Sequence, residues 1–163
     1  MKEITFKPIG IIHSPFKEPV GIPIQPAGAK GIKGNIEIFE EFKEGLKDLD
    51  GFSHIVLLFN FHLSEGYKLE VMPFMEDKIR GVFATRAPRR PNQIGMSIVR
   101  LEKVEDNILH ISNVDIIDGT PLLDIKPFVS KFDCFDINEN EKVGWLKKRV
   151  KRVDEHRSDE RFS

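Results

Sequence analysis

Residues 54–61 have the sequence HIVLLFNF, and this stretch decides the fold. Six of the eight residues are apolar, and Ser53 and His62 bound the run with polar groups. Such a short apolar run is typical of a buried strand, because helices of globular domains usually need ten or more residues. We therefore expect a central β-strand over residues 54–61, with another strand on each side of it.

Other short apolar segments flank this strand and are separated by turn residues. The predicted strands cover residues 4–12, 35–39, 67–74, 79–85, 96–104, 108–117 and 122–128. The triplet at residues 105–107, EDN, predicts a hairpin turn. Helical spacing occurs only in a short acidic segment with Phe42, Leu46 and Leu49, and in a basic segment at residues 142–152. The pattern predicts a mainly β fold, either an antiparallel barrel or a sandwich.

Composition and length favour one domain. The chain has 163 residues, 40% of them apolar, and a net charge of -1. No apolar run approaches the roughly 18 residues of a spanning helix, and residues 1–6 do not form a signal peptide. Cys134 is the only cysteine, and the five histidines lack metal-ligand spacing, so we expect neither a disulfide nor a metal site. A cytoplasmic protein without a membrane segment is predicted.

The domain boundary is expected near residue 137. Residues 1–137 would form the barrel, and residues 138–163 would form an extension with the basic helix and a frayed tail. The long loop at residues 15–34, here called the proline-rich loop, contains four prolines and four glycines. Loops of this length are usually functional or disordered, and proline makes them stiff and extended. It is a first candidate for ligand binding.

A second candidate is the arginine loop, residues 85–97, with the sequence TRAPRRPNQIGMS. Residues 78–103 contain seven basic residues and one acidic residue. Arginine guanidinium groups offer planar sets of donors that suit phosphate or carboxylate. A rigid, solvated connection between two strands accounts for the same spacing equally well.

A third candidate is the acidic segment, residues 115–127, with the sequence DIIDGTPLLDIKP. Asp115, Asp118 and Asp124 place three carboxylates close to strand ends. They could bind ribose hydroxyls, stabilise a cation or accept a proton, and a simple hairpin corner is the alternative. His62 is a further candidate, because it follows the central strand directly.

Seven short segments of the chain match a known family in the same order. They are GIIHSPFK at 10–17, PIQP at 23–26, FSH at 52–54, GVFATR at 81–86, RPNQIGMS at 90–97, DGTP at 118–121 and DIKP at 124–127. Across roughly residues 8–128 the chain resembles the TsaA-like domain family of TrmO-type tRNA methyltransferases. Because seven segments agree in order, chance is a poor explanation.

The resemblance implies a β-barrel enzyme, usually a homodimer, that uses S-adenosylmethionine. Its implied reaction is methylation of the N6 nitrogen of threonylcarbamoyladenosine beside the anticodon of tRNA. Position by position, the implied cofactor contacts are Ile24, Gln25, Pro26, Phe61, His62, Arg86, Met96, Asp118, Gly119, Thr120, Pro121 and Leu122. Arg86 would suit the methionine carboxylate of the cofactor.

Contacts with tRNA are expected at Arg89, Arg90 and Asn92, and at the basic segment 142–152. A solvated face packed on the barrel is an equal alternative for that segment. No residue is assigned as proton acceptor. Three other functions remain open: a tRNA-binding or nucleotide-binding barrel without catalysis, a methyltransferase for a different small molecule, and a partner-binding domain.

Overall fold

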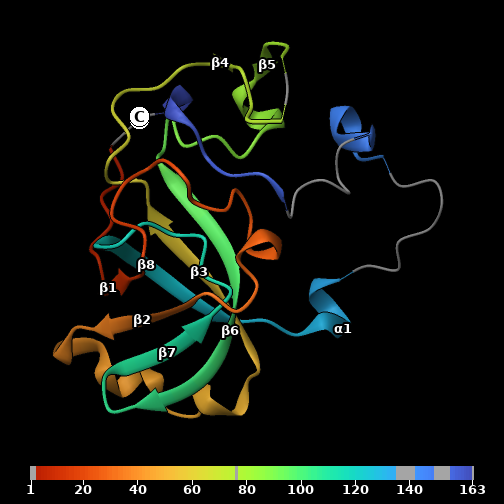
Figure 1. The fold of residues 1–163 in the computed structure, drawn as a ribbon. Helices are drawn as coiled ribbons and strands as arrows, with labels where there is room; N and C mark the ends of the chain where they lie inside the picture. Colours follow the sequence, from red (N-terminus) through yellow and green to blue (C-terminus); the bar gives the residue numbers. More distant parts are fainter. Residues whose placement is uncertain (1–2, 76, 135–141, 149–154, 163) are drawn as a thin grey trace.

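Six strands form a closed barrel in which every neighbouring pair is antiparallel (Figure 1). The computed structural model describes residues 3–75, 77–134, 142–148 and 155–162. In spatial order the barrel strands are β1 (Gly10–His13), β2 (Lys33–Ile38), β7 (Ile108–Ser112), β6 (Ile94–Glu105), β3 (His54–Asn60) and β8 (Thr120–Pro127). The predicted mainly β fold is confirmed, and closure of the sheet selects the barrel over the sandwich.

The central strand β3 alternates between two environments. Ile55, Leu57 and Phe59 are buried inside the barrel, whereas Val56 and Leu58 are only half-buried. A barrel strand has one inner and one outer face, so its side chains alternate. The strand prediction is confirmed, but the apolar run is not buried on both faces.

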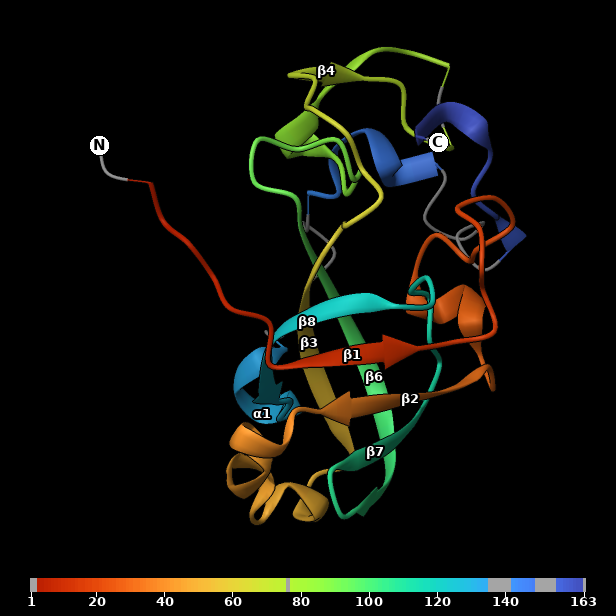
Figure 2. The same ribbon diagram turned by 90° about the vertical axis from the view of Figure 1, so that its left-hand side faces the viewer.

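The segment between β2 and β3 closes one end of the barrel (Figure 2). It forms two 3-10 helices, η2 (Glu40–Leu46) and η3 (Leu49–Gly51), where one short helix was predicted. Asp48 separates them with a φ of 65°. Phe42, Leu46 and Leu49 pack against the barrel core, so the predicted apolar spacing does mark the buried face.

Two predicted strands are much shorter in the structure. Residues 67–74 and 79–85 contribute only the two-residue strands β4 (Glu70–Val71) and β5 (Arg80–Gly81), followed by the 3-10 helix η4 (Val82–Ala84). This ribbon lies above the open end of the barrel (Figure 1). Its apolar side chains include Tyr67, Leu69 and Ile79, which are exposed. Apolar pattern alone therefore overestimates the barrel here.

The first and last segments also differ from prediction. Strand β1 begins at Gly10, because Ile4 and Phe6 are exposed and make no sheet contacts. After α1 (Ser130–Asp133), the described part of the basic segment contains a 3-10 helix, η5 (Gly144–Lys148). Residues 149–152 of the predicted helix lie outside the described residues, and so does the predicted domain boundary at residue 137. Within the described ranges, no helix has the length and apolar character needed to cross a membrane.

Candidate functional site

A cavity of about 340 Å³ lies at the barrel mouth, the end at which β3 finishes and β6 and β8 begin. Its volume is in the usual range for small-molecule sites, which are mostly apolar with a few polar groups. The proline-rich loop, the arginine loop and the acidic segment all contribute to its wall. The predicted site residues on this wall are Ile24, Gln25, Phe61, His62, Arg86, Arg90, Met96 and Thr120.

Two aromatic rings form one side of the cavity. Phe59 and Phe61 pack edge to face, with ring centroids 5.4 Å apart. Gly95 lies opposite Phe59 on β6, and a Cβ atom at Gly95 would lie 2.2 Å from a carbon of the Phe59 ring. Glycine is therefore required here, because any side chain would displace the ring.

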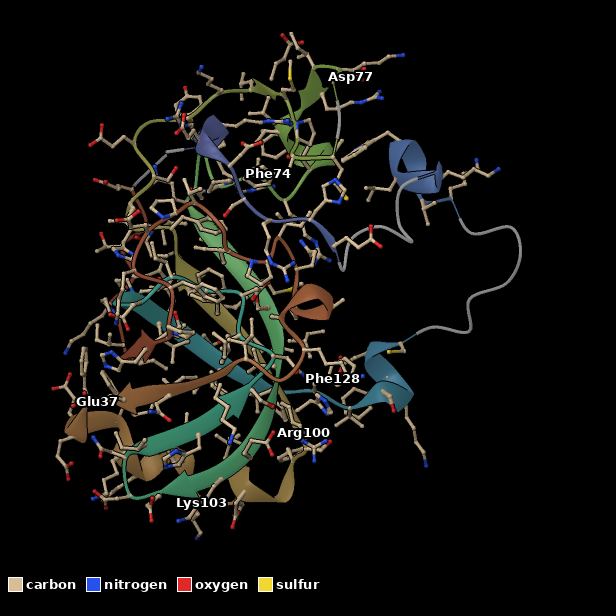
Figure 3. The ribbon with its side chains drawn as sticks, in the orientation of Figure 1. Glu37, Phe74, Asp77, Arg100, Lys103 and Phe128 are labelled. Atoms are coloured by element: carbon tan, nitrogen blue, oxygen red, sulfur yellow. The ribbon has the colours of Figure 1, made fainter. Side chains whose placement is uncertain are left out.

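A hydrogen bond joins the proline-rich loop to the arginine loop. Arg86 Nη1 donates to Gln25 Oε1 over 2.6 Å. A second cavity of about 680 Å³ shares both residues and is also lined by Pro26 and Phe74. Figure 3 labels Phe74 among the loops above the barrel. Pro26, a predicted cofactor contact, thus lies on the second cavity and not on the first.

Asp118 does not line the first cavity. Its carboxylate accepts a hydrogen bond from Ser14 N at 3.0 Å and pairs with Lys17 Nζ at 2.7 Å. The Lys17 contact, with Ser14 and His13, holds the pKa of Asp118 below its usual value. Asp118 N also donates to Phe16 O over 2.7 Å. The turn therefore anchors the start of the proline-rich loop.

Three of the four remaining predicted contacts in this turn do not line the first cavity. Gly119 N donates to Ile12 O over 2.9 Å, and Leu122 is fully buried in the barrel core. Pro121 pairs with Ile11 in the sheet. Of the predicted turn residues, Thr120 is the one on the cavity wall. The acidic segment therefore lines the first cavity through Thr120 and through residues 115–117, and not through the other predicted turn residues.

Arg90 holds the arginine loop in shape. Its Nη1 donates to Thr85 O at 2.9 Å, to Val82 O at 3.2 Å and to Ala87 O at 3.4 Å. Its guanidinium also lies over the Phe83 ring, 5.9 Å from the centroid. One guanidinium nitrogen that satisfies several carbonyls fixes a turn, so this side chain has a structural role.

The basic residues of segment 78–103 do not form a single patch. Arg100 pairs with Glu102 and Lys103 pairs with Glu105, at 3.2 and 2.6 Å. Figure 3 shows Arg100 and Lys103 far from Phe74, toward the opposite end of the barrel. The strong positive charge counted in the sequence is therefore divided between two ends of the molecule.

Two buried polar atoms on the cavity wall lack partners. His62 Nδ1 and Ser64 Oγ make no hydrogen bond among the described residues. Burial lowers the pKa of His62, so its ring is neutral near pH 7. A buried polar atom without a partner is costly, and a bound ligand is one way to satisfy it.

Asp115 lies on the cavity wall, and the sequence left three roles open for it: ribose binding, stabilising a cation or accepting a proton. Ser97 Oγ donates to its Oδ1 over 2.7 Å. Burial raises the pKa of Asp115 to about 6, although Ser97 and the positive charge of Arg86 act in the opposite direction. The signal in the sequence was its place among the three carboxylates of the acidic segment, close to strand ends.

The described C-terminal residues return to the cavity. We call residues 155–162 the C-terminal strap. Ser158 Oγ accepts from Ile22 N at 2.8 Å and donates to Pro19 O at 2.5 Å, and the Ser158 backbone pairs with Gly21 and Ile22. Ser158 and Asp159 line the cavity, and Figure 2 shows the strap beside the proline-rich loop. The predicted frayed tail is therefore wrong for residues 155–162, and no local sequence signal indicated this return.

The family model described as the tRNA-methyltransferase O N-terminal domain matches residues 11–134. The chain belongs to this family. A relative named probable S-adenosyl-L-methionine-binding protein, from Pyrococcus abyssi, is 55% identical over 98% of this chain and 85% of its own length. A mouse relative named tRNA (adenine(37)-N6)-methyltransferase is 41% identical over 78% of this chain.

Solved structures of TrmO have the same fold. A crystal structure of TrmO from Pseudomonas aeruginosa has a TM-score of 0.71 and 41% identity, and covers 85% of this chain. Another crystal structure of TrmO has a TM-score of 0.73 and 43% identity. The matches span 62% and 64% of those chains, and 31% of the mouse relative. The TrmO N-terminal domain is thus the shared part, and the C-terminal strap lies beyond the residues that the family model matches.

Proposed function

We propose that the chain binds S-adenosylmethionine at the barrel mouth and transfers its methyl group to the N6 nitrogen of threonylcarbamoyladenosine beside the anticodon of tRNA. Membership of the TrmO N-terminal domain family and the names of the archaeal and mouse relatives support this function. The observation that carries it is the cavity at the barrel mouth, whose wall includes two residues with a buried polar atom that has no partner in the described part of the chain.

The residues on the wall fit this cofactor. Phe59 and Phe61 offer an apolar surface for a flat ring, and His62 and Ser64 on the same wall each carry a buried polar atom without a hydrogen-bond partner among the described residues. Arg86 is exposed on the wall and suits a carboxylate. When bound, the cofactor supplies a methyl group on a sulfonium sulfur.

The chain's own contribution is mainly positioning. Methyl transfer requires the acceptor nitrogen, the methyl carbon and the sulfur to lie in line, and fixing two reactants in this way provides much of the acceleration. The Arg86–Gln25 hydrogen bond and the anchored Asp118 turn hold the two loops that form the wall. No covalent intermediate with the chain is needed.

For tRNA, we propose contacts from Arg89 and Asn92 on the arginine loop and from the exposed residues Lys142 and Lys147. Phosphate contacts of this kind add affinity that falls with salt. Arg90 would act indirectly, because it holds the loop that carries the other two residues. Replacing Lys147 with Ala should reduce the salt dependence of tRNA binding and leave cofactor affinity unchanged.

We also propose that the chain forms a homodimer. The segment around β4 and β5 exposes several large apolar side chains, namely Leu63, Tyr67, Leu69, Met72, Ile79 and Phe83. Exposed apolar groups gathered in one segment are typical of a protein interface. Light scattering on the wild type and on Leu69→Asp tests this, since the variant should shift the mass toward one chain, and an unchanged mass contradicts the interface.

Two measurements test the function. Calorimetry with S-adenosylmethionine should give saturable heat, and mass spectrometry of tRNA nucleosides should detect a new methyl group on the modified adenosine. If the chain binds tRNA but not the cofactor, it is a binding barrel without catalysis. If it binds the cofactor and leaves tRNA unmethylated, the acceptor is a different molecule.

A further inference from the structure

The carboxylate of Asp115 is held firmly in the wall of the barrel-mouth cavity. Its neighbours Val114 and Ile116 are buried in the core, at 0% and 2% exposure, which fixes the backbone. Ser97, buried on β6, donates its hydroxyl hydrogen to Oδ1 over 2.7 Å. The backbone of Asp115 itself is the other hydrogen-bonding group that acts on this carboxylate. In the described part of the chain no other side chain hydrogen-bonds to it, and Asp115 lines the cavity, where a ligand can approach.

Asp115 differs from the other carboxylate on the wall. Asp159 pairs with Arg161 Nε at 3.0 Å. Asp115 forms no ion pair within the described residues, although Arg86 is close enough to act on it electrostatically. Besides Asp115, the charged and titratable groups on this wall are His62, Arg86, Arg90 and Asp159.

Methylation of an N–H nitrogen releases a proton that must go somewhere. We propose that Asp115 accepts the proton of the acceptor nitrogen, with Ser97 as the residue that positions it. The acceptor nitrogen forms a bond to the methyl carbon, and the bond between that carbon and sulfur breaks with its electron pair remaining on sulfur. The N–H proton passes to the Asp115 carboxylate and then to solvent. This inference rests on the proposed function.

Charge distinguishes Asp115 from His62 as the acceptor. When Asp115 takes a proton it becomes neutral, which a poorly solvated site favours. When His62 takes a proton it becomes a cation, and its buried Nδ1 has no partner to stabilise that charge. Burial also acts in opposite directions on the two groups, raising the pKa of Asp115 and lowering that of His62.

The test uses the full chain, labelled S-adenosylmethionine and tRNA that contains threonylcarbamoyladenosine. Asp115→Asn should lower kcat by about 100-fold or more, the usual contribution of a positioned base. It should change the cofactor Kd by less than about threefold, because the proposed contact is with the acceptor. Asp124→Asn is the matched control, since Asp124 pairs with Lys126 and is not on the cavity wall, so its kcat should equal that of the wild type.

A second variant tests the mechanism independently of Asp115 itself. Ser97→Ala removes a hydrogen bond that favours the ionised carboxylate, so the pKa of Asp115 should rise. Carbon NMR of the labelled carboxyl should show this rise, and the acidic limb of the pH–rate profile should move up by the same amount. A profile that stays fixed while the NMR titration moves would overturn the proposal.

The other outcomes are equally decisive. If Asp115→Asn retains wild-type kcat, or if it loses cofactor binding more than about tenfold with kcat unchanged, Asp115 is not the proton acceptor. In both cases the wild type still methylates tRNA, so the proposed function survives. If the wild type binds cofactor and never methylates tRNA, the proposed function fails first and this inference fails with it.

Discussion

Ser158→Ala should weaken cofactor binding although Ser158 lies outside residues 11–134, the part of the chain that the family model matches. The Ser158 hydroxyl makes two hydrogen bonds to the proline-rich loop, from Ile22 N and to Pro19 O. Alanine removes both and leaves Ile22 N without a side-chain partner, at a cost of about 1–3 kcal/mol. If that free energy holds the loop in its binding conformation, the Kd for S-adenosylmethionine rises by roughly 5- to 150-fold.

Calorimetry with wild type, Ser158→Ala and Glu160→Gln measures this effect. Glu160 is exposed in the same strap and forms no hydrogen bond or ion pair among the described residues, so Glu160→Gln should bind like the wild type. Circular dichroism should show that the barrel is intact in all three proteins. A change of less than about twofold in the Ser158→Ala Kd would refute the reasoning, because the strap would then have no influence on the cavity.

Three further predictions concern the cavity wall and core. Arg86→Ala should weaken S-adenosylmethionine binding by about 1–3 kcal/mol in calorimetry, and Arg100→Ala, at the other end of the barrel, should have no effect. Gly95→Ala should displace the Phe59 ring and lower the melting temperature, as a thermal melt would show, because the added Cβ would lie 2.2 Å from that ring. The pKa of Asp115 is raised in the folded state, so the unfolded chain loses this proton at a lower pH than the folded chain does. The free energy of unfolding should therefore fall as pH rises from about 4 to about 6. Denaturant titrations should show that Asp115→Asn gains stability over the wild type across this pH window, and a constant difference would contradict it.

Much of the barrel could be predicted from apolar pattern, because each barrel strand buries one face in a shared core. The run at residues 54–61 and the hairpin at residues 105–107 are examples. The same pattern failed at residues 67–85, where Tyr67 and Ile79 are exposed. The apolar pattern identifies apolar side chains, but it does not identify the residues that cover them in the fold.

All three segments singled out in the sequence line the barrel-mouth cavity, but several of the side chains named within them do not. Gln25 and Arg86, both named as implied cofactor contacts, are joined by a hydrogen bond. The orientation of the Asp118 side chain depends on its ion pair with Lys17, about a hundred residues away in sequence. This long-range pairing cannot be derived from local spacing. The contact between Ile22 and Ser158 joins positions 136 residues apart, so it too required the structure.

The closed sheet also affects which parts of this protein can vary in sequence. The core of the barrel is made mainly by its strands, while the residues proposed to act on ligands lie at one mouth and largely on connecting loops. A closed barrel has no free strand edge through which altered chains could aggregate. Loops at the mouth can therefore be exchanged between relatives at little risk to folding, which makes the barrel a scaffold for new acceptor specificities.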